Sequence, residues 1–322
     1  MVYFKTENDK IKIKKRVLMT ESLIERLKTS AVTLEITPPK SPDFSKTIST
    51  LKAIPSLSKI DGFTVTDNPL AKLKYSGVLA SVKVQSELQK PVICTVSMRD
   101  KNNLAMQSEL LGLNDFDVRG ILALTGDPAR LSDQPHVKGV FEGDSSQLLR
   151  MIRFFNEGVD FGGKAINPKP KPIYPFAVSN SYSKNFSSLS KKIHKKIENY
   201  ASGIITQPVF DLDVAKKLVQ MFDEAKKDFS DERGEARLIL GVFPIVSLKT
   251  AQFLYAHVPG IYVPESFIDA LLKASKISAE EEYKVGMELS KKIFKEVYGL
   301  NKRVHLMCAN KFAMLDELLE DI

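Results

Sequence analysis

The sequence predicts a single α/β domain, a (β/α)8 or TIM barrel with an N-terminal helical extension. Eight short apolar segments, several of them rich in β-branched residues, alternate with segments whose apolar residues recur at helical spacing. No GxGxxG sequence follows an early strand, although an open dinucleotide-binding sheet would normally carry one. Eight strand and helix units in one chain therefore favour the closed barrel over the open, doubly wound sheet.

The alternation begins after a basic lead-in, residues 1–20. A helix starts at Thr20, which can cap the apolar residues that follow at helical spacing. The first strand, around residues 33–36, must stop before Pro38 and Pro39, because proline lacks the N–H that a strand ladder uses. Further strands are predicted at 62–66, 91–96 and 120–125, and helices at 45–54, 70–88 and 102–113.

The second half of the chain continues the pattern after a long excursion, residues 129–143. Loops of this length inside a compact domain are usually functional. Strands are predicted at 173–178, 203–206, 238–243 and 304–308. Helices are predicted at 145–155, 189–200, 212–227, 247–256, 264–273, 279–298 and 311–319. Residues 21–322 are thus expected to form one barrel domain.

The composition is that of an ordinary globular protein, with 43% hydrophobic and 27% charged residues. No apolar run approaches the roughly 18 residues of a membrane span, and the N-terminus lacks the apolar centre of a signal peptide. The formal charge of +8 comes from lysines dispersed along helical segments. We therefore expect neither membrane nor nucleic-acid binding, while the mild positive field favours anionic small molecules.

The only cysteines, Cys94 and Cys308, lie inside apolar, strand-like segments. Such positions suit small core residues of a protein in a reducing compartment better than a disulfide framework. The four histidines are scattered and show no metal-ligand spacing. We expect free cysteines, no structural metal and a cytoplasmic location.

Polar side chains stand where three of the predicted strands end. Glu35 precedes the two prolines, Asp127 follows the fourth strand and Gln207 follows the sixth. In a parallel barrel, active sites gather at the carboxyl ends of the strands and draw their groups from several of them. Each residue also has a simpler interpretation. Glu35 could pair with a lysine, Asp127 could serve a turn, and Gln207 could satisfy loop backbone.

Taken together and in order, the strand ends resemble the methylenetetrahydrofolate reductase family, flavin-dependent barrel enzymes of one-carbon metabolism. The set is specific because of its order, whereas no single segment is decisive. The third- and fourth-strand segments are closest to the branch found in acetogens and in fusions with homocysteine methyltransferases. The matching segments are 34–40, 65–68, 94–112, 122–128, 155–158, 205–207, 244–248, 258–264 and the closing strand followed by Asn310.

The resemblance implies that 5,10-methylenetetrahydrofolate is reduced to 5-methyltetrahydrofolate, which supplies methyl groups for methionine synthesis. It also implies FAD as the cofactor and NADH or NADPH as the electron donor. The chemistry needs an acid that opens the five-membered ring, a hydride donor and anchors for the pterin.

Three residues match the catalytic positions of the family. Glu35 matches the general acid, and partial burial can raise the pKa of such a carboxyl group towards operating pH. Asp127 matches an aspartate near the flavin pyrimidine edge and the folate, where its charge disfavours the anionic reduced flavin. Gln207 matches a glutamine that contacts the substrates, and its amide can both donate and accept hydrogen bonds.

The resemblance also implies a set of cofactor contacts. Thr66 matches a threonine that contacts the flavin, and Gly126 permits close approach of the backbone. Lys195 and Lys196 fall where the family places basic residues for the FAD phosphates, although lysines on a helix are usually only solvated. Ser179 falls near the flavin contacts that follow the fifth strand.

The sequence departs from the family pattern at several positions. Leu248, expected at the substrate site, replaces an aromatic residue that in some relatives stacks on the nicotinamide or the folate. An aromatic ring would add about 1 kcal/mol of stacking beyond its buried area. Val92 replaces a histidine of some relatives, and Asn199 with Tyr200 replaces a pair of small residues. Leu248 therefore keeps open the alternative that a partner protein supplies the electrons.

An alternative of a different class is a non-catalytic flavin- or folate-binding subunit of a larger assembly. The joint presence of Glu35, Asp127 and Gln207 speaks against it, because a binding module does not need the acid. A nucleic-acid binder would show strong, salt-dependent binding. Members of the family are commonly oligomers, so a homo-oligomer is expected.

Overall fold

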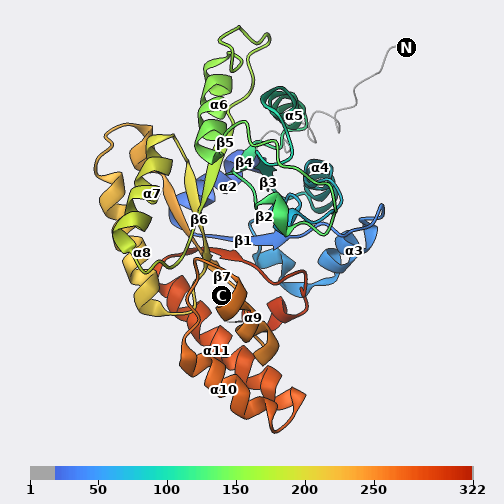
Figure 1. The fold of residues 1–322 in the computed structure, drawn as a ribbon, viewed down its shortest axis with the longest axis vertical. Helices are drawn as coiled ribbons and strands as arrows, with labels where there is room; N and C mark the ends of the chain where they lie inside the picture. The colour runs from blue at the N-terminus through green and yellow to red at the C-terminus, as the bar shows by residue number, and fades with distance from the viewer. Residues whose placement is uncertain (1–18, 321–322) are drawn as a thin grey trace.

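The computed structural model describes residues 19–320. Eight parallel strands close into a barrel in sequence order, with β1 hydrogen-bonded to β8 (Figure 1). The predicted (β/α)8 barrel is thereby confirmed. The strands are β1 (Ala31–Ile36), β2 (Gly62–Val65), β3 (Val92–Ser97), β4 (Gly120–Leu124), β5 (Tyr174–Ser179), β6 (Gly203–Pro208), β7 (Arg237–Val242) and β8 (Arg303–Leu306).

Helices surround the barrel, and in the described part of the chain helix α2 precedes the first strand as the predicted extension. Residues 1–18 of the basic lead-in lie outside the described residues. The helices are α2 (Met19–Thr29), α3 (Ser45–Ala53), α4 (Gly77–Leu88), α5 (Asn103–Asp115), α6 (Ser145–Glu157), α7 (Phe186–Glu198), α8 (Leu212–Lys226), α9 (Leu248–His257), α10 (Glu265–Ser275), α11 (Ala279–Leu300) and α12 (Met314–Leu318). No helix in the described part of the chain combines the length and apolarity needed to cross a bilayer.

The barrel has two apolar regions, because successive side chains of a strand point to opposite faces. The outward-facing residues and the surrounding helices form the larger core. Inside the barrel, Ile93, Leu122 and Phe176 pack with Leu23 and Leu27 of α2. Helix α2 therefore fills the end of the barrel at which the strands begin, and the opposite end is left for a site.

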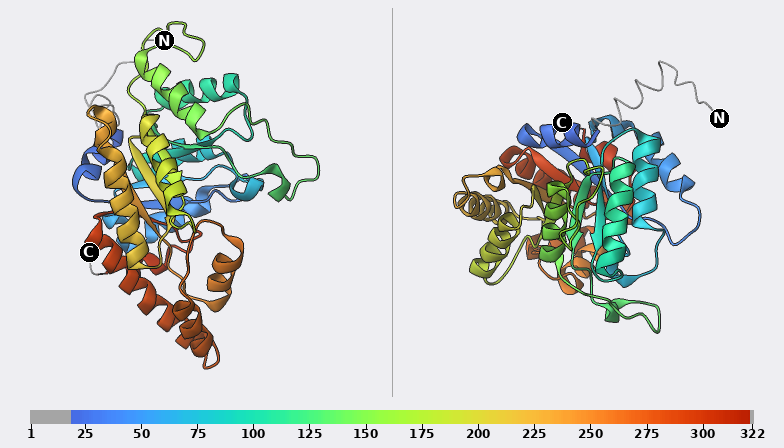
Figure 2. Two further views of the ribbon diagram at one scale, coloured as in Figure 1. Left: turned by 60° about the vertical axis from the view of Figure 1, so that its left-hand side comes forward. Right: turned by 90° about the horizontal axis from the view of Figure 1, so that it is seen from above.

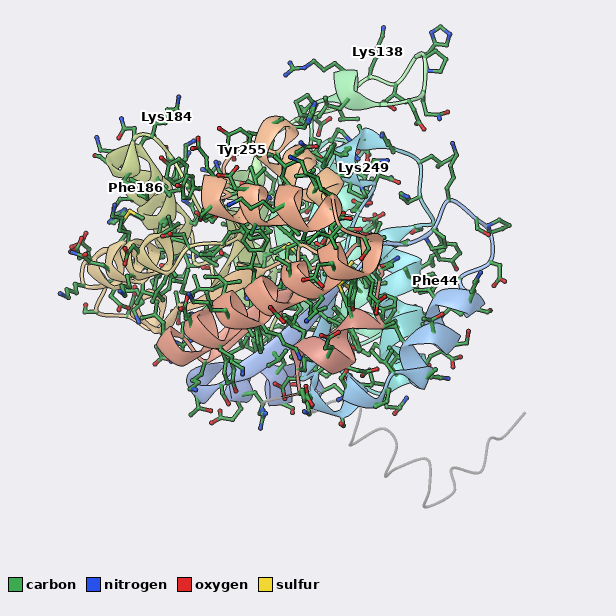
Figure 3. The ribbon with its side chains drawn as sticks, turned by 90° about the horizontal axis from the view of Figure 1, so that it is seen from below. Phe44, Lys138, Lys184, Phe186, Lys249 and Tyr255 are labelled. Atoms are coloured by element: carbon green, nitrogen blue, oxygen red, sulfur yellow. The ribbon has the colours of Figure 1, made fainter. Side chains whose placement is uncertain are left out.

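Two features extend beyond the ring of helices. Helices α9, α10 and α11 pack together on one side, around Ile245, Leu254 and Leu271 (Figures 1 and 2). The connection between β4 and α6 projects as an extended loop, and Figure 3 shows Lys138 on it. This loop contains the predicted long excursion, residues 129–143.

The predicted helix at 70–88 is wrong in its first turns, since α4 begins only at Gly77. Leu70 and Ala71 both have a φ of 56°, which a right-handed helix cannot accommodate. The hydroxyl of Ser76 instead accepts a hydrogen bond from the Leu79 N–H and caps the helix there. The segment after β2 thus forms an irregular loop over the end of the barrel.

The predicted bounds also differ near two other strand ends. Strand β6 continues to Pro208, with a register irregularity between Ile205 and Pro208, so Gln207 lies within the strand. After β8, Ala309 and Asn310 have φ values of 48° and 60°, which delay the last helix to α12. Cys94 and Cys308 are both buried and free, as expected.

Candidate active site

A cavity of about 460 Å³ lies at the end of the barrel where the strands terminate. Its wall draws residues from the ends of β1 to β6 and from helices α6 and α7. They are Glu35, Thr66, Asp67, Pro69, Thr95, Ser97, Arg99, Leu122, Leu124, Thr125, Gly126, Asp127, Ser145, Val178, Ser179, Asn180, Leu189, Lys192, Lys196 and Gln207. Seven sequence-predicted site residues are therefore brought together: Glu35, Thr66, Gly126, Asp127, Ser179, Lys196 and Gln207.

Glu35 lies on the inward face of β1, one residue before the strand ends at Ile36. Its side chain keeps partial access to the cavity. Burial raises the pKa of its carboxyl group to about 7, because the charged form is poorly solvated there. A carboxyl group with this pKa can hold a proton near neutral pH and release it to a bound molecule.

Asp127 follows β4 and is held by a neighbouring loop. Its Oδ2 accepts a hydrogen bond of 2.7 Å from the N–H of Leu70. The carboxylate thereby ties the irregular loop after β2 to the end of β4, and it remains part of the cavity wall. One acidic side chain thus has both a structural partner and access to a ligand.

Gly126 permits the closest packing in the site. Its φ is +95°, and a Cβ at this position would lie 2.3 Å from Ser97 Oγ and 2.7 Å from Arg99 Cβ. Real Cβ atoms do not approach other atoms so closely, so only glycine fits. The backbone after β4 can therefore pass directly over the end of β3.

Thr66 supplies a polar atom without a protein partner. Its Oγ1 is buried and has no hydrogen bond among the described residues, although the residue lines the cavity. Leaving a buried hydroxyl unsatisfied costs about 1–3 kcal/mol. The hydroxyl is therefore available to hydrogen-bond a molecule bound in the cavity.

Gln207 reaches the cavity from the irregular end of β6. The neighbouring Thr206 hydroxyl donates to the Gln207 carbonyl at 2.8 Å and accepts from the N–H of Gly241 at 2.9 Å. These two bonds fix the backbone at the irregularity. The amide side chain of Gln207 therefore extends into the cavity from a rigid base.

Cationic side chains reach the cavity from α7. Lys196 lines the wall, and burial lowers the pKa of its ammonium group, an effect that nearby Asp144 partly offsets. Lys192, one helical turn earlier, also lines it. Lys195 points elsewhere, with its Nζ 4.0 Å from an Asp144 carboxylate oxygen, and does not contribute to the wall.

The remaining predicted residues differ in their placement. Ser179 ends β5, lines the cavity and donates its hydroxyl proton to the Asn180 carbonyl at 3.0 Å. Leu248 is not among the lining residues. It begins α9, packs against the apolar cluster of α9 to α11, and donates its N–H to Glu282 at 2.7 Å.

Sequence reasoning missed three charged residues of the wall: Asp67, Arg99 and Lys192. Asp67 follows β2 and accepts a hydrogen bond from the Ser97 N–H at 3.3 Å. Arg99 follows β3, is only 1% exposed, and donates to Asp100 and to the Asn68 carbonyl. Their positions just after strands were the available signal, and the i, i+4 spacing from Lys196 was the signal for Lys192.

Comparison with known proteins adds a family match to this geometry. The sequence model described as methylenetetrahydrofolate reductase matches residues 20–322, nearly the whole chain. A search of curated proteins finds no match.

Solved structures with the same fold are remote in sequence. An uncharacterized Clostridium thermocellum protein, described as binding two copies of 5-methyl-5,6,7,8-tetrahydrofolic acid, has a TM-score of 0.58 and 18% identity, over 94% of this chain and 100% of that one. The EDTA monooxygenase EmoA from Chelativorans sp. BNC1 has a TM-score of 0.53 and 10% identity, over 91% and 94%. DmoA from Hyphomicrobium sulfonivorans has a TM-score of 0.52 and 8% identity, over 90% and 86%. At these identities the likeness concerns the fold alone.

Proposed function

Because the chain belongs to the methylenetetrahydrofolate reductase family, an assignment that makes it an enzyme acting on a folate, we propose that it reduces 5,10-methylenetetrahydrofolate to 5-methyltetrahydrofolate. The proposed cofactor is FAD, with NADH or NADPH as the electron donor. The observation that carries the proposal is Glu35, an acid with a pKa of about 7 in the wall of the cavity. The C. thermocellum protein described as binding a methyltetrahydrofolate supports a folate as the ligand.

The residues of the cavity fit a flavin dinucleotide. The buried Thr66 hydroxyl has no hydrogen-bond partner among the described residues, and Gly126, which packs closely on Ser97 and Arg99, lines the cavity without a side chain of its own. Lys192 and Lys196 supply positive charge for phosphates. When bound, the flavin would supply the hydride that reduces the folate.

Glu35 would act as the general acid. Converting the methylene bridge into a methyl group on N5 breaks the bond from the bridging carbon to N10, and N10 must then gain a proton. The carboxyl group of Glu35 can donate it, since burial keeps a large fraction of the group protonated near pH 7. Glu35 alone can therefore supply the proton that N10 gains.

Asp127 and Gln207 would bind and orient the pterin from the opposite wall. The Asp127 carboxylate keeps one oxygen on the Leu70 N–H, and its remaining acceptor capacity can receive pterin N–H groups. The Gln207 amide can donate and accept at the same time. Holding the substrate between these residues and Glu35 would align N10 with the acid.

A second candidate concerns only the electron donor. Leu248, in the position of an aromatic stacking residue of some relatives, lies outside the cavity wall and packs in the α9 to α11 cluster. This placement favours the alternative in which a partner protein, rather than NAD(P)H, reduces the flavin. The folate half of the reaction would be unchanged.

The deciding experiment is anaerobic stopped-flow absorbance of the purified, flavin-loaded chain at about 450 nm, where an oxidised flavin absorbs. NADH, NADPH and 5-methyltetrahydrofolate are added separately. Rapid bleaching by NADH or NADPH and by the folate supports the full reaction. Bleaching by the folate alone supports a protein electron donor, and a chain that binds no flavin contradicts the proposal.

The variant Glu35→Gln separates an enzyme from a binding subunit. The amide keeps the size of the side chain but cannot donate a carboxyl proton. The enzyme should keep its flavin and lose folate reduction by about 10²- to 10⁴-fold. If folate turnover is unchanged in this variant, Glu35 is not the acid.

A further inference from the structure

The carboxyl group of Glu35 has no partner that holds it. Among the described residues, no hydrogen bond or ion pair reaches it, and burial is the cause of its raised pKa. Asp127, by contrast, is held by the Leu70 N–H. The position of the Glu35 carboxyl group therefore depends on the backbone of β1, because no hydrogen bond or ion pair with the described residues fixes the side chain.

One contact holds β1 two residues before Glu35. His305 of β8 lies inside the barrel, 2% exposed, with its Nδ1 2.8 Å from Thr33 Oγ1. Its Nε2 lies 3.2 Å from Thr64 Oγ1 of β2. Thr33 and Glu35 share the inward face of β1, since alternate residues of a strand point the same way. One imidazole thus joins three adjacent strands directly beneath the acid.

The hydrogen bonds of this ring can all be satisfied by a neutral imidazole. Burial lowers the pKa of His305 to about 3, so the ring is uncharged at physiological pH. The Thr33 hydroxyl can donate to the Val304 carbonyl at 3.3 Å, which leaves its oxygen to accept from Nδ1–H. Nε2 then accepts from the Thr64 hydroxyl. The three strands are joined without a buried charge.

A second contact holds β1 two residues after Glu35. Asn310 accepts a hydrogen bond from the Thr37 N–H at 3.0 Å and donates to the Thr37 carbonyl at 2.6 Å. Strand β1 has ended at Ile36, and Pro38 has no N–H to continue a ladder. The Asn310 amide therefore replaces the ladder at this point, from a left-handed backbone with φ of 60° that asparagine tolerates.

We propose that His305 and Asn310 are positioning residues that hold the β1 backbone on both sides of Glu35 and thereby fix its carboxyl group at the cavity wall. Cys308, which lies between them in sequence, is close enough for the charge of Glu35 to raise the pKa of its thiol, after the larger effect of burial. The segment after β8 therefore lies alongside the end of β1, the strand that carries Glu35. The proposal deepens the proposed function, because it treats Glu35 as the acid of that reaction.

The test measures the titration of Glu35 in ligand-free protein by carboxyl ¹³C NMR, with the signal assigned by its absence in Glu35→Gln. The variant Asn310→Gly removes the amide and suits the positive φ, so it adds no backbone strain. Without this clamp, the pair of hydrogen bonds between Asn310 and Thr37, the end of β1 can move towards solvent. The pKa of Glu35 should then fall towards the ordinary value of about 4.3.

Asn156→Ala is the matched control. Asn156 of α6 makes the same pair of bonds with one backbone unit, donating to the Ile173 carbonyl and accepting from the Ile173 N–H, both at 2.8 Å. This clamp lies before β5, and its loss should leave the titration of Glu35 unchanged. If Asn310→Gly titrates like the wild type, or if Asn156→Ala shifts Glu35 equally, the proposal is overturned.

His305 is tested by two variants. His305→Leu removes the hydrogen bonds to Thr33 and Thr64, so β1 is held less firmly and the pKa of Glu35 should fall. His305→Gln keeps a donor and an acceptor, so the pKa of Glu35 should stay closer to that of the wild type. Equal titration in the two variants overturns the role of the ring. In the unmodified protein, the Thr37 amide should exchange with solvent far more slowly than the amide of exposed Lys40, and fast exchange overturns the clamp even if a variant does not fold.

The titration does not depend on activity. A chain that fails to reduce a folate but whose Glu35 responds to Asn310→Gly would lose the proposed function and keep the positioning role. If the chain reduces the folate but the titration of Glu35 is the same in these variants as in the wild type, the proposed function stands and the positioning role is overturned.

Discussion

At Glu35 the surroundings decide how the residue titrates. Burial raises the pKa of the carboxyl group from 4.5 to about 7. At a pH between these two pKa values, the Glu35 carboxyl group of the folded protein keeps a proton that the unfolded chain has released. This contribution to stability is therefore fully present below about pH 4 and is lost as the pH rises through about 7. In denaturant titrations, the stability of the wild type relative to Glu35→Gln should fall over this range.

The same titration should appear in activity. Because the acid must be protonated to act, folate reduction should decline above about pH 7 under single-turnover conditions. A rate that stays flat up to pH 9, with chemistry limiting, would contradict the assignment of Glu35 as the acid.

Gly126 provides a second prediction at the residue scale. Gly126→Ala would place a Cβ 2.3 Å from Ser97 Oγ at a φ of +95°, so the backbone after β4 must shift. Strain of this kind costs about 1–3 kcal/mol. We expect a lower midpoint in urea and weaker flavin binding.

Gly112→Ala is the control for this substitution. Gly112 lies in α5, and no atom lies within 4 Å of an added Cβ. Alanine should stabilise the helix by about 0.5–1 kcal/mol. A similar decrease of the urea midpoint in both variants would mean that the close packing of Gly126 on Ser97 is unimportant.

The convergence of the strand-end residues was predictable, whereas side-chain direction on helices was not. Glu35, Asp127 and Gln207 meet because the carboxyl ends of parallel strands share one edge of the barrel. Lys195 and Lys196 are adjacent in sequence, yet only Lys196 faces the cavity, because neighbouring residues of a helix point about 100° apart. Their directions depend on how α7 packs.

At the scale of elements, α2 closes the end of the barrel opposite the cavity. Leu23 is 2% exposed and packs against the interior cluster. The helix is also fastened by Glu21, which pairs with the buried guanidinium of Arg119, itself bound to Asp117 at 2.8 Å. Removing the Leu23 side chain should therefore loosen the inner layer of the barrel.

Leu23→Ala should lower the free energy of unfolding by about 2–5 kcal/mol, because a buried leucine leaves a cavity. Leu79→Ala is the comparison, since Leu79 of α4 is 59% exposed and should change stability by less than about 0.5 kcal/mol. Equal effects in chemical denaturation would show that α2 does not contribute to the barrel core.

The existence and order of the elements followed from periodicity, while several boundaries did not. Alternation of apolar segments predicted every strand of the barrel, because strands buried on both faces are apolar throughout. The start of α4 was missed because Leu70 and Ala71 favour a helix by composition, although both adopt positive φ in the loop. The Leu70 N–H of this loop donates a hydrogen bond to Asp127, and such long-range contacts leave no local pattern.

At the scale of the whole molecule, the barrel separates stability from chemistry. The interior between α2 and the middle of the strands is apolar, and the layer above it changes to Thr33, Thr64 and His305 before the cavity begins. Polar groups of the cavity are therefore supported by a layer of satisfied hydrogen bonds. A ligand that binds only the folded barrel should raise the stability of the entire domain.

FAD should accordingly raise the melting temperature. At about 100 times its dissociation constant, a ligand adds about 2.7 kcal/mol to the free energy of unfolding. Lys196→Gln removes a charged donor from the cavity wall, and such bonds contribute about 1.5–3 kcal/mol. The affinity should fall by roughly ten- to a hundredfold, and the shift at the same FAD concentration should shrink accordingly.

Lys195→Gln makes the same change of charge one residue away. Because this side chain is exposed and lies near Asp144 outside the cavity wall, it should alter the FAD-induced shift little beyond a salt-dependent effect. An equal decrease of the FAD-induced melting-temperature shift in the two variants would indicate that only the overall positive field of α7 attracts the cofactor. A loss confined to Lys196→Gln, measured at matched ionic strength, would place the charge that matters inside the cavity.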